Sequence, residues 1–544
     1  MTNQSLGRPG CVRWSAAVLV AATGLTSCGN GSTTPGQANS GAPSGGATTT
    51  AGDSSSTGAT TSGAGGTMGT GSSTATGTVA GSGTTTGGPT GSGGAMGTGG
   101  GGPGTCTPAV PLSQKTAIRP QTQFDDAVNS FFNSTDPFIK NTVLPNIDKY
   151  RKSDATVKVI TADGKPAVGY KITALLANPD FKWGASPARP LNGSESTPPP
   201  DVEKLWGEIF NYSIPQYTTK WANIEAVQGT YDYTSADKLL DLMTRNGVLM
   251  EQHFVVGYHP DWLVTLATDA DRAKAQEAFG LDILNRYHDK IQYWQVYNED
   301  YLTHIDRAHV YFDQTAFFKK VSTMYPDLKL GINDCFQFTE TPLPAPNVIK
   351  TTFPGIHFLG VHSHRPRRLW ASPQQIYQTY DPYTNSGVFL HITEFGIIRD
   401  EAGDASFQGT AKTGTWTDAT LAQYFVQTMA TCFSHPAVEA YNHFGVGPDI
   451  NRYTGNNLFV DGGGFTPSYY AFRSLIIDKF RTLAEGATDA AGQLKYRGFQ
   501  GEYEATVVTP TGTTAKGRFY LKPGPAQEFT LRVTDGDQQL CLAQ

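Results

Sequence analysis

Two glutamates stand at the ends of two apolar segments of this 544-residue chain. Glu299 closes the segment IQYWQVYNE and Glu394 closes GVFLHITE, and both segments have the short apolar pattern of a buried strand. In an α/β barrel the carboxyl ends of the parallel strands meet on one face, where such folds collect their catalytic side chains. Two carboxylates brought together on that face suggest glycoside hydrolysis.

Eight strand candidates alternate with helical patterns, as a (β/α)8 TIM barrel requires. Segments such as 235–247 carry apolar residues at helical spacing. No GxGxxG turn follows the first strand, which argues against an open dinucleotide-binding sheet. The count places Glu299 on the fourth strand and Glu394 on the seventh. The strand candidates begin at residues 181, 217, 248, 291, 328, 356, 387 and 438.

The pattern becomes β-like on both sides of the barrel. Apolar residues alternate from Arg151 onward around a turn at residues 162–166, which predicts a hairpin. The tail from Leu483 alternates in the same way. We expect these flanks to form a small β-sandwich or an accessory sheet against the barrel, with a separate carbohydrate-binding module as the alternative.

The first residues have the layout of an export signal. Arg8 and Arg13 precede an apolar run over residues 14–25 that is too short to span a bilayer. The run ends in LTSC, which resembles a bacterial lipobox and predicts that Cys28 carries a lipid in the mature protein. An ordinary signal peptide is the alternative. In both cases the protein is exported, either lipid-anchored at the cell surface or secreted.

A long stretch of small and polar residues follows the signal. It consists almost wholly of Gly, Ser, Thr, Ala and Pro, so it lacks the apolar side chains that offset the entropy of ordering. We expect a disordered linker that acts as a tether. The predicted segments are a signal peptide at 1–28, the linker at 29–105, a β-rich lead-in at 106–180, the barrel at 181–483 and a β-rich segment at 484–544.

Composition excludes some partners. The net charge of -6 and the pI near 6.0 give no basic face for nucleic acid, which favours a neutral polymer as the ligand. The six cysteines are widely spaced without a CxxC pair, so we expect no metal site, and no motif indicates a cofactor. Cys335 and Cys432 fall in predicted barrel elements and are expected to be small core residues. We expect a monomer.

Seven segments, taken in order, resemble glycoside hydrolase family 10, the retaining endo-β-1,4-xylanases with a (β/α)8 barrel. The resemblance covers about residues 145–483. The matching segments are TKWANIEAVQGTYDY (219–233), EQHFVVGYHPDWL (251–263), WQVYNED (294–300), LGINDC (330–335), GVHSH (360–364), HITE (391–394) and FTPSYYAF (465–472).

The resemblance implies roles for five residues of the reaction centre. Glu299 matches the general acid/base and Glu394 the nucleophile of a double displacement, with the two carboxyl groups about 5–5.5 Å apart. Asn298 matches the residue that bonds the sugar 2-hydroxyl. His253 would contact the attacked sugar, and His364 would hydrogen-bond the nucleophile.

Further residues would bind the sugar chain. Lys220 matches a sugar contact on the glycone side, although a solvated lysine at a strand end is the alternative reading. Tyr258 and Trp262 could stack on pyranose rings, but aromatic residues also commonly serve as packing residues. Phe444 stands on the eighth strand where the family usually has a Trp over the attacked sugar.

Three other positions depart from the family pattern. Tyr217 replaces an Asn that bonds the distal sugar, His362 replaces a Gln, and Gly396 replaces an Asp that supports the histidine at 364. The resemblance therefore predicts the reaction more specifically than the substrate.

The first hypothesis is a surface-tethered retaining hydrolase that cleaves internal β-1,4 linkages of xylan in plant cell walls, anchored by lipid to the outer membrane or cell surface. One alternative is a related barrel hydrolase acting on another β-glycan. Another is a non-catalytic surface lipoprotein that binds glycan, although such a protein has no need to keep both glutamates.

Overall fold

The computed structural model describes most of the chain from residue 114 onward. The predicted signal peptide with Cys28, the predicted linker, and His364 lie outside the described residues. These residues are 114–187, 203–204, 207–300, 309–338, 342–363, 369–397, 406–409, 412–447, 457–460, 464–533 and 540–542.

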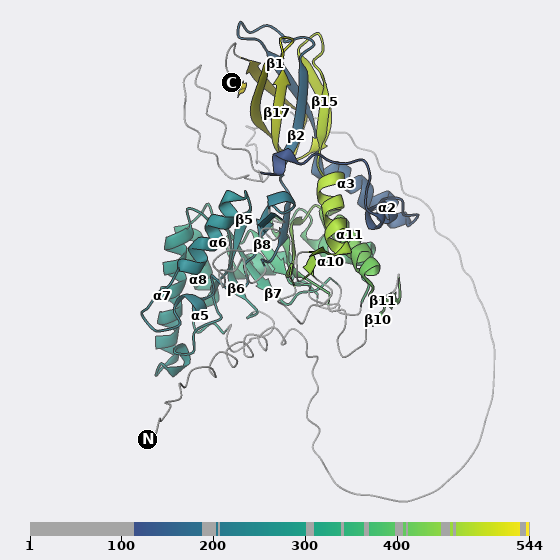
Figure 1. Cartoon of the computed structure of the whole chain (residues 1–544). Coiled ribbons are helices and arrows are strands. Elements are labelled where there is room, and N and C mark those ends of the chain that lie inside the picture. Colours follow the sequence, from purple (N-terminus) through teal and green to yellow (C-terminus); the bar gives the residue numbers. More distant parts are fainter. Residues whose placement is uncertain are drawn as a thin grey trace, which may run out of the picture. The chain divides into compact units, whose positions relative to one another are not determined.

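Eight parallel strands close into a barrel in the order β12-β3-β4-β5-β6-β7-β8-β9 (Figure 1). Closure is made by β12 and β3, where Ala440 pairs with Lys182 and His443 with Ala185. The predicted TIM barrel is therefore confirmed. The strands are β3 (Lys182–Ala185), β4 (Tyr212–Ser213), β5 (Leu249–Val256), β6 (Tyr293–Asn298), β7 (Lys329–Asp334), β8 (Phe358–Val361), β9 (Phe389–Phe395) and β12 (Val438–His443).

The second barrel strand is not where the sequence predicted it. The prediction began at residue 217, but β4 is only two residues long and precedes it. The predicted strand instead holds a turn and the short helix α5 (Trp221–Ile224). Trp221 and Ile224 are both buried, and their spacing of three is that of a helix face. A strand as short as β4 leaves no alternation to detect.

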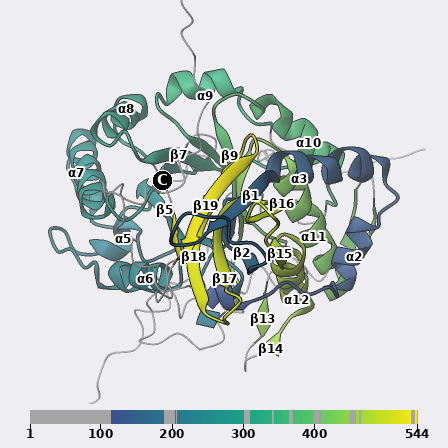
Figure 2. The same cartoon turned by 90° about the horizontal axis from the view of Figure 1, so that it is seen from above.

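Helices surround the barrel strands, as the view from above shows (Figure 2). Their apolar faces pack inward; Ala236, Leu239, Leu240 and Met243 of α6 are all buried. No helix among the described residues is long and apolar enough to cross a membrane. The α-helices are α2 (Asp126–Phe132), α3 (Leu144–Arg151), α5, α6 (Thr234–Arg245), α7 (Asp269–Tyr287), α8 (Gln314–Met324), α9 (Pro346–Thr352), α10 (Pro373–Tyr380), α11 (Asp418–Ser434) and α12 (Pro467–Arg473).

Single turns of other helix types complete the helical layer. The 3-10 turns are η2 (Gln114–Ala117), η5 (Leu263–Thr265) and η6 (Asp381–Tyr383), and the π-helical segments are η3 (Ile139–Val143) and η8 (Ser474–Lys479). Two short ribbons pair β10 (Ser406–Phe407) with β11 (Gly414–Thr415) and β13 (Phe459–Val460) with β14 (Gly464–Phe465).

The two flanks of the barrel together form a sandwich of two four-stranded sheets. Phe519 of one sheet lies 4.5 Å from Phe529 of the other, measured between ring centroids, so the sheets pack face to face. One sheet has the order β16-β1-β19-β20 and the other β15-β2-β17-β18. The strands are β1 (Lys152–Ile160), β2 (Lys171–Pro179), β15 (Leu483–Ala487), β16 (Gln493–Phe499), β17 (Gly501–Val508), β18 (Thr514–Leu521), β19 (Gln527–Val533) and β20 (Leu540–Leu542).

The predicted hairpin of β1 and β2 forms only at its turn, where Ile160 and Pro166 make an antiparallel bridge. A turn does form between them, since the Thr161 N–H donates to the Lys165 carbonyl at 2.9 Å and Gly164 has φ +82°. The two strands then enter different sheets: β1 lies between β16 and β19, and β2 between β15 and β17. The turn was visible in the sequence, but the pairing partners lie more than 300 residues away.

Candidate active site

Glu299 and Glu394 emerge at the carboxyl ends of two barrel strands. Glu299 directly follows β6, and Glu394 is the sixth residue of β9. Glu299 has φ +57°, a conformation rare for a side-chain-bearing residue, and its N–H donates to the Asn333 carbonyl at 3.1 Å. This turn at the strand end lets Asn298 and Glu299 approach the same group of side chains, although adjacent residues of a regular strand face opposite ways.

One imidazole reaches both carboxylates. His362 Nδ1 lies 3.8 Å from Glu299 Oε1, and His362 Nε2 lies 3.4 Å from Glu394 Oε1. The ring is fully buried at the end of β8. His362 was singled out in the sequence only as a departure from the family pattern. The structure makes it the side chain that links the two acids.

Asn333 is the residue that the sequence analysis missed. It is the fifth of the six residues of β7, and its Nδ2 donates to Asn298 Oδ1 at 2.7 Å and to Glu394 Oε1 at 3.1 Å. Its Oδ1 accepts from the Thr393 hydroxyl at 2.7 Å, which fixes the amide orientation. The same signal that identified Glu299, a polar residue closing an apolar strand, also marks Asn333 in LGIND.

Burial sets the protonation of Glu299. Desolvation raises the pKa of its carboxyl well above the usual range, and the nearby charge of Glu394 raises it further, while Lys220 opposes both. Glu299 therefore holds a proton at pH values where an exposed glutamate has lost it. An acid of this kind beside an acceptor carboxylate is the arrangement that general acid catalysis at a glycosidic oxygen needs.

Lys220 lies inside the site and not in solvent. Its side chain is 8% exposed, directly before α5, so the alternative of a solvated lysine is wrong. Its Nζ lies 4.5 Å from the ring centroid of Tyr258, 5.5 Å from that of Phe254 and 5.8 Å from that of Tyr217. Burial lowers the pKa of Lys220, and the charges of Glu394 and Glu299 raise it.

His253 lies beside the second glutamate. Its Nε2 is 3.8 Å from Glu394 Oε1, and its Nδ1 is 2.6 Å from Gln295 Oε1. The ring is buried in β5. The structure thus places His253 beside the predicted nucleophile, and its contact with the attacked sugar stays a prediction.

Trp262 and Phe444 make packing contacts. The Trp262 indole N–H donates to the Glu225 carbonyl at 2.9 Å, and its ring packs edge-on against Trp221. Phe444 is 1% exposed, and its N–H donates to the Phe395 carbonyl at 2.8 Å. Stacking of either ring on a sugar stays a prediction.

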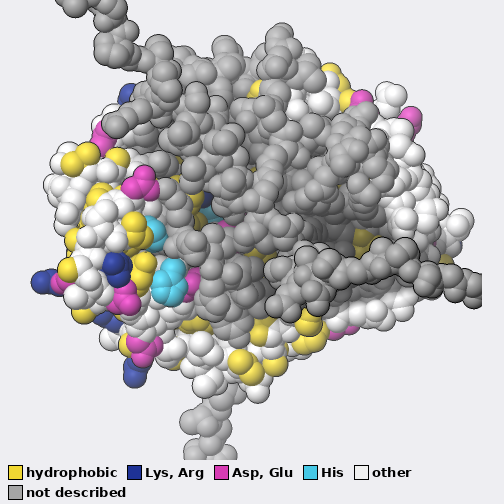
Figure 3. Space-filling model, turned by 90° about the horizontal axis from the view of Figure 1, so that it is seen from below, with side chains coloured by type: hydrophobic (Ala, Val, Ile, Leu, Met, Phe, Trp, Pro, Cys, Tyr) yellow, Lys and Arg dark blue, Asp and Glu magenta, His cyan; other side chains and the backbone are white. Residues whose placement is uncertain are grey.

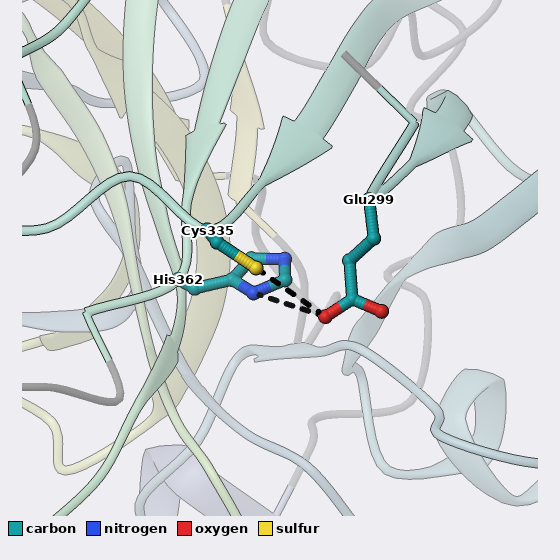
Figure 4. A group of neighbouring side chains, drawn as sticks. All are labelled: Glu299, Cys335 and His362. Carbon is teal, nitrogen blue, oxygen red and sulfur yellow. Dashed lines mark hydrogen bonds and ion pairs between the residues drawn. The ribbon is translucent and has the colours of Figure 1, made fainter. Parts of the chain in front are cut away.

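Glu299, Cys335 and His362 form a group whose potential ligand atoms lie within 4.8 Å of one another (Figure 4). Cys335 is disulfide-bonded, so its sulfur is not the thiolate that binds a metal ion. The Cys335 Sγ lies 3.5 Å from Glu299 Oε1. Cys432 is a free, buried core residue as expected. Cys335 was also expected to be a core residue, but it is disulfide-bonded and lies beside Glu299.

The surface seen from below mixes acidic, basic, histidine and hydrophobic side chains over its described part (Figure 3). Neither sign of charge dominates there. The two glutamates at the ends of β6 and β9 are buried.

The chain is similar to known proteins over much of its length. It is 22% identical over 405 residues to the anti-sigma-I factor RsgI6 of Acetivibrio thermocellus, covering 71% of this chain and 49% of that protein. It is 25% identical over 213 residues to a β-1,4-xylanase of Dictyoglomus thermophilum, covering 36% of this chain and 59% of the relative. The chain thus spans about half the length of these curated relatives.

A solved structure, the native xylanase 10B of Thermotoga maritima, aligns with a TM-score of 0.44 at 19% identity, covering 55% of this chain and 96% of that one. The family model described as "Glycosyl hydrolase family 10" matches residues 185–449, which contain the strands from β4 to β12 and both glutamates. Residues 185–449 of this chain are therefore a glycosyl hydrolase family 10 domain.

Proposed function

We propose that this protein is a retaining glycoside hydrolase that cleaves internal β-1,4 linkages of xylan. The observation that carries the proposal is the buried Glu299, whose pKa is raised, on the same barrel face as Glu394. Two carboxyl groups with different surroundings can take the two different roles that the reaction requires.

The reaction proceeds in two displacements. Protonated Glu299 gives its proton to the leaving glycosidic oxygen while the Glu394 carboxylate attacks the anomeric carbon, forming a glycosyl-enzyme. Glu299, now ionised, removes a proton from water as that water attacks the same carbon and releases Glu394. Asn298 binds the 2-hydroxyl of the attacked sugar, an interaction that strengthens in the transition state.

The site around Glu394 supports its role as nucleophile. Asn333 donates to Glu394 Oε1, and His362 lies 3.4 Å from the same oxygen. The Asn333 amide holds this carboxylate oxygen in a fixed position, which is what attack on the anomeric carbon needs.

Xylan is proposed as the polymer for two reasons. The chain resembles a family of β-1,4-xylanases, and relatives of this chain are named as β-1,4-xylanases. The test is release of reducing sugar from xylan, mixed-linkage β-glucan and arabinan, with Glu394→Ala as the control. We expect release from xylan that the variant lacks. Equal release by wild type and variant would overturn the mechanism, and release from another polymer alone would replace the substrate.

A glycan-binding protein without activity is the second candidate. It is favoured by one observation, namely that the relative covering 71% of this chain is named an anti-sigma-I factor and not a xylanase. Retention of both glutamates favours hydrolysis in this chain. Binding of insoluble xylan without release of sugar from any of the three polymers would favour the binder.

We also propose that the protein is exported and carries lipid on Cys28. The support is the basic and apolar layout of residues 8–28 and the LTSC segment. Metabolic labelling with radioactive palmitate in a bacterial host should label the wild type and not Cys28→Ser. Labelling of neither form, with export retained, would indicate an ordinary signal peptide.

A further inference from the structure

A column of polar side chains, all buried except the partly exposed Glu439, runs through the barrel interior from Glu394 toward the amino ends of the strands. Its charged members alternate in sign, and no step of the proposed reaction uses them directly. Lys182 Nζ lies 2.8 Å from Glu439 Oε1, His391 Nε2 lies 3.2 Å from Glu439 Oε2, and His391 Nδ1 lies 2.8 Å from Glu251 Oε2.

The middle of the column is an ion pair. Burial lowers the pKa of His391, but the charges of Glu251 and Glu439 outweigh burial, so its pKa is raised above the usual value. Both Glu251 and His391 have fully buried side chains. Glu251 Oε2 accepts from the Tyr212 hydroxyl and faces His391 Nδ1, so the Glu251 carboxylate is the acceptor of this network.

That carboxylate determines which way the Gln295 amide points. The Gln295 Nε2 donates to Glu251 Oε1, because the amide oxygen has no proton to offer a carboxylate. The Gln295 Oε1 is therefore turned toward His253, at 2.6 Å from Nδ1. An amide oxygen only accepts, so the proton on this hydrogen bond belongs to His253 Nδ1.

The tautomer of His253 follows from this chain of hydrogen bonds. With Nδ1 protonated, Nε2 is unprotonated whenever the ring is neutral, and Nε2 is the atom that lies 3.8 Å from Glu394 Oε1. A neutral ring of this kind presents an acceptor and not a donor on the side of Glu394. It can accept from a sugar hydroxyl, and it leaves the carboxylate lone pairs available for attack.

We infer that Glu251 and Gln295 are positioning residues that hold His253 as the Nδ1–H tautomer beside the nucleophile. The inference rests on the proposed function only for its effect on rate, because the tautomer is a property of the protein without substrate. Structural stability alone does not account for the column, since a buried ion pair is often no more stabilising than a well-packed apolar pair.

The test compares three variants of the full chain. Gln295→Met removes both amide hydrogen bonds at nearly constant volume and leaves the Glu251–His391 pair intact. Glu251→Gln replaces the obligate acceptor with an amide that can also donate. Tyr212→Phe is the matched control, because the Tyr212 hydroxyl donates to Glu251 Oε2 and lies 3.2 Å from His391 Nδ1, whereas Gln295 donates to Glu251 Oε1.

The tautomer is measured by 15N NMR of histidine-labelled protein, with the His253 signal identified by its loss in His253→Gln. We expect the Nδ1–H pattern in the wild type and in Tyr212→Phe, and a loss of that pattern in Gln295→Met and Glu251→Gln. With xylan, kcat should fall about 10–100-fold in these two variants, with a smaller change in KM. That is the range for residues that orient a metal-binding histidine through a hydrogen bond to its other ring nitrogen.

Three outcomes would overturn the inference: an Nε2–H pattern in the wild type, an unchanged pattern in Gln295→Met, or an equal change in Tyr212→Phe. If Glu251→Gln does not fold, Gln295→Met carries the test by itself. If the wild type releases no sugar from any polymer, the proposed function fails while the NMR comparison still tests the positioning.

Discussion

At the residue scale, one buried imidazole lies close to both acids. His362 is 3.8 Å from Glu299 and 3.4 Å from Glu394. Burial raises the pKa of Glu299, and the nearby charge of Glu394 raises it further, so the carboxyl keeps its proton to higher pH. Lys220 has the opposite effect on Glu299. These opposed influences set the pH range in which the proposed acid is protonated and yield two predictions.

The first prediction concerns Glu299→Gln. Because Gln cannot donate a proton to the leaving oxygen, kcat on xylan should fall by about 10²–10⁴-fold, the usual contribution of a general acid. An aryl xyloside with a good leaving group needs no protonation, so formation of its glycosyl-enzyme should be nearly unaffected. Pre-steady-state kinetics on both substrates measure the difference. Equal losses on both would remove Glu299 from the role of acid.

The second prediction concerns the high-pH limit of activity. Activity falls as pH rises through the pKa of Glu299, because the acid loses its proton. Lys220 lowers that pKa, so Lys220→Met should move the high-pH limb of kcat/KM to higher pH, and Lys220→Arg should leave it near the wild-type position. A pH–rate profile on a soluble xylo-oligosaccharide, whose sugar leaving group must be protonated, compares the three proteins. A shift to lower pH in Lys220→Met would contradict the described electrostatics.

At the scale of the element, Arg151 joins the end of α3 to the segment between α11 and β12. Its guanidinium donates to the carbonyls of Phe433, His435 and Val438, and it lies 5.0 Å from the ring centroid of Phe181. Burial lowers the pKa of Arg151 to about 10, which still leaves it charged at neutral pH. The three carbonyls are left without this donor if the side chain is removed.

The third prediction follows from these contacts. Arg151→Met should lower the free energy of unfolding by about 2–5 kcal/mol, since it removes hydrogen bonds from a charged donor and leaves buried acceptors unpaired. Arg497→Met is the control, because Arg497 is 38% exposed and pairs with the surface residues Asp148 and Asp154. Its effect should stay below about 1 kcal/mol. Urea unfolding followed by fluorescence measures both, and equal effects would contradict the assignment.

At the scale of the whole molecule, the sandwich is discontinuous in sequence. Strands β1 and β2 precede the barrel and β15–β20 follow it, and each sheet contains strands from both flanks. In each sheet a strand from before the barrel lies between two strands from after it. Neither flank can complete a sheet by itself, which argues against a carbohydrate-binding module made of the C-terminal flank alone.

The fourth prediction tests that dependence. A fragment of residues 483–544 should be unfolded by circular dichroism, because both of its sheets would lack their inner strand. The full chain with the same residues deleted should be insoluble, since β1 and β2 would expose unpaired edges. The intact protein is the control for both. A folded fragment that binds xylan would establish an independent module.

The sequence predicted the site better than it predicted the pairing of strands. Glu299, Asn298, His253 and Lys220 were found because strand ends and short motifs are local signals, and the structure brings them together. Asn333 carried the same local signal and was overlooked. The polar column could not be foreseen, because the contact of Glu251 with His391 joins residues 140 positions apart.

The amino-acid sequence by itself determined the barrel, seven of its strands and the two glutamates, because these depend on periodicity and on residue types at strand ends. Only the tertiary structure decided the place of β4, the partners of β1 and β2, and the contact of His362 with both acids. Those features depend on which distant segments meet, and burial among those segments, not residue type, gives Glu299 its raised pKa.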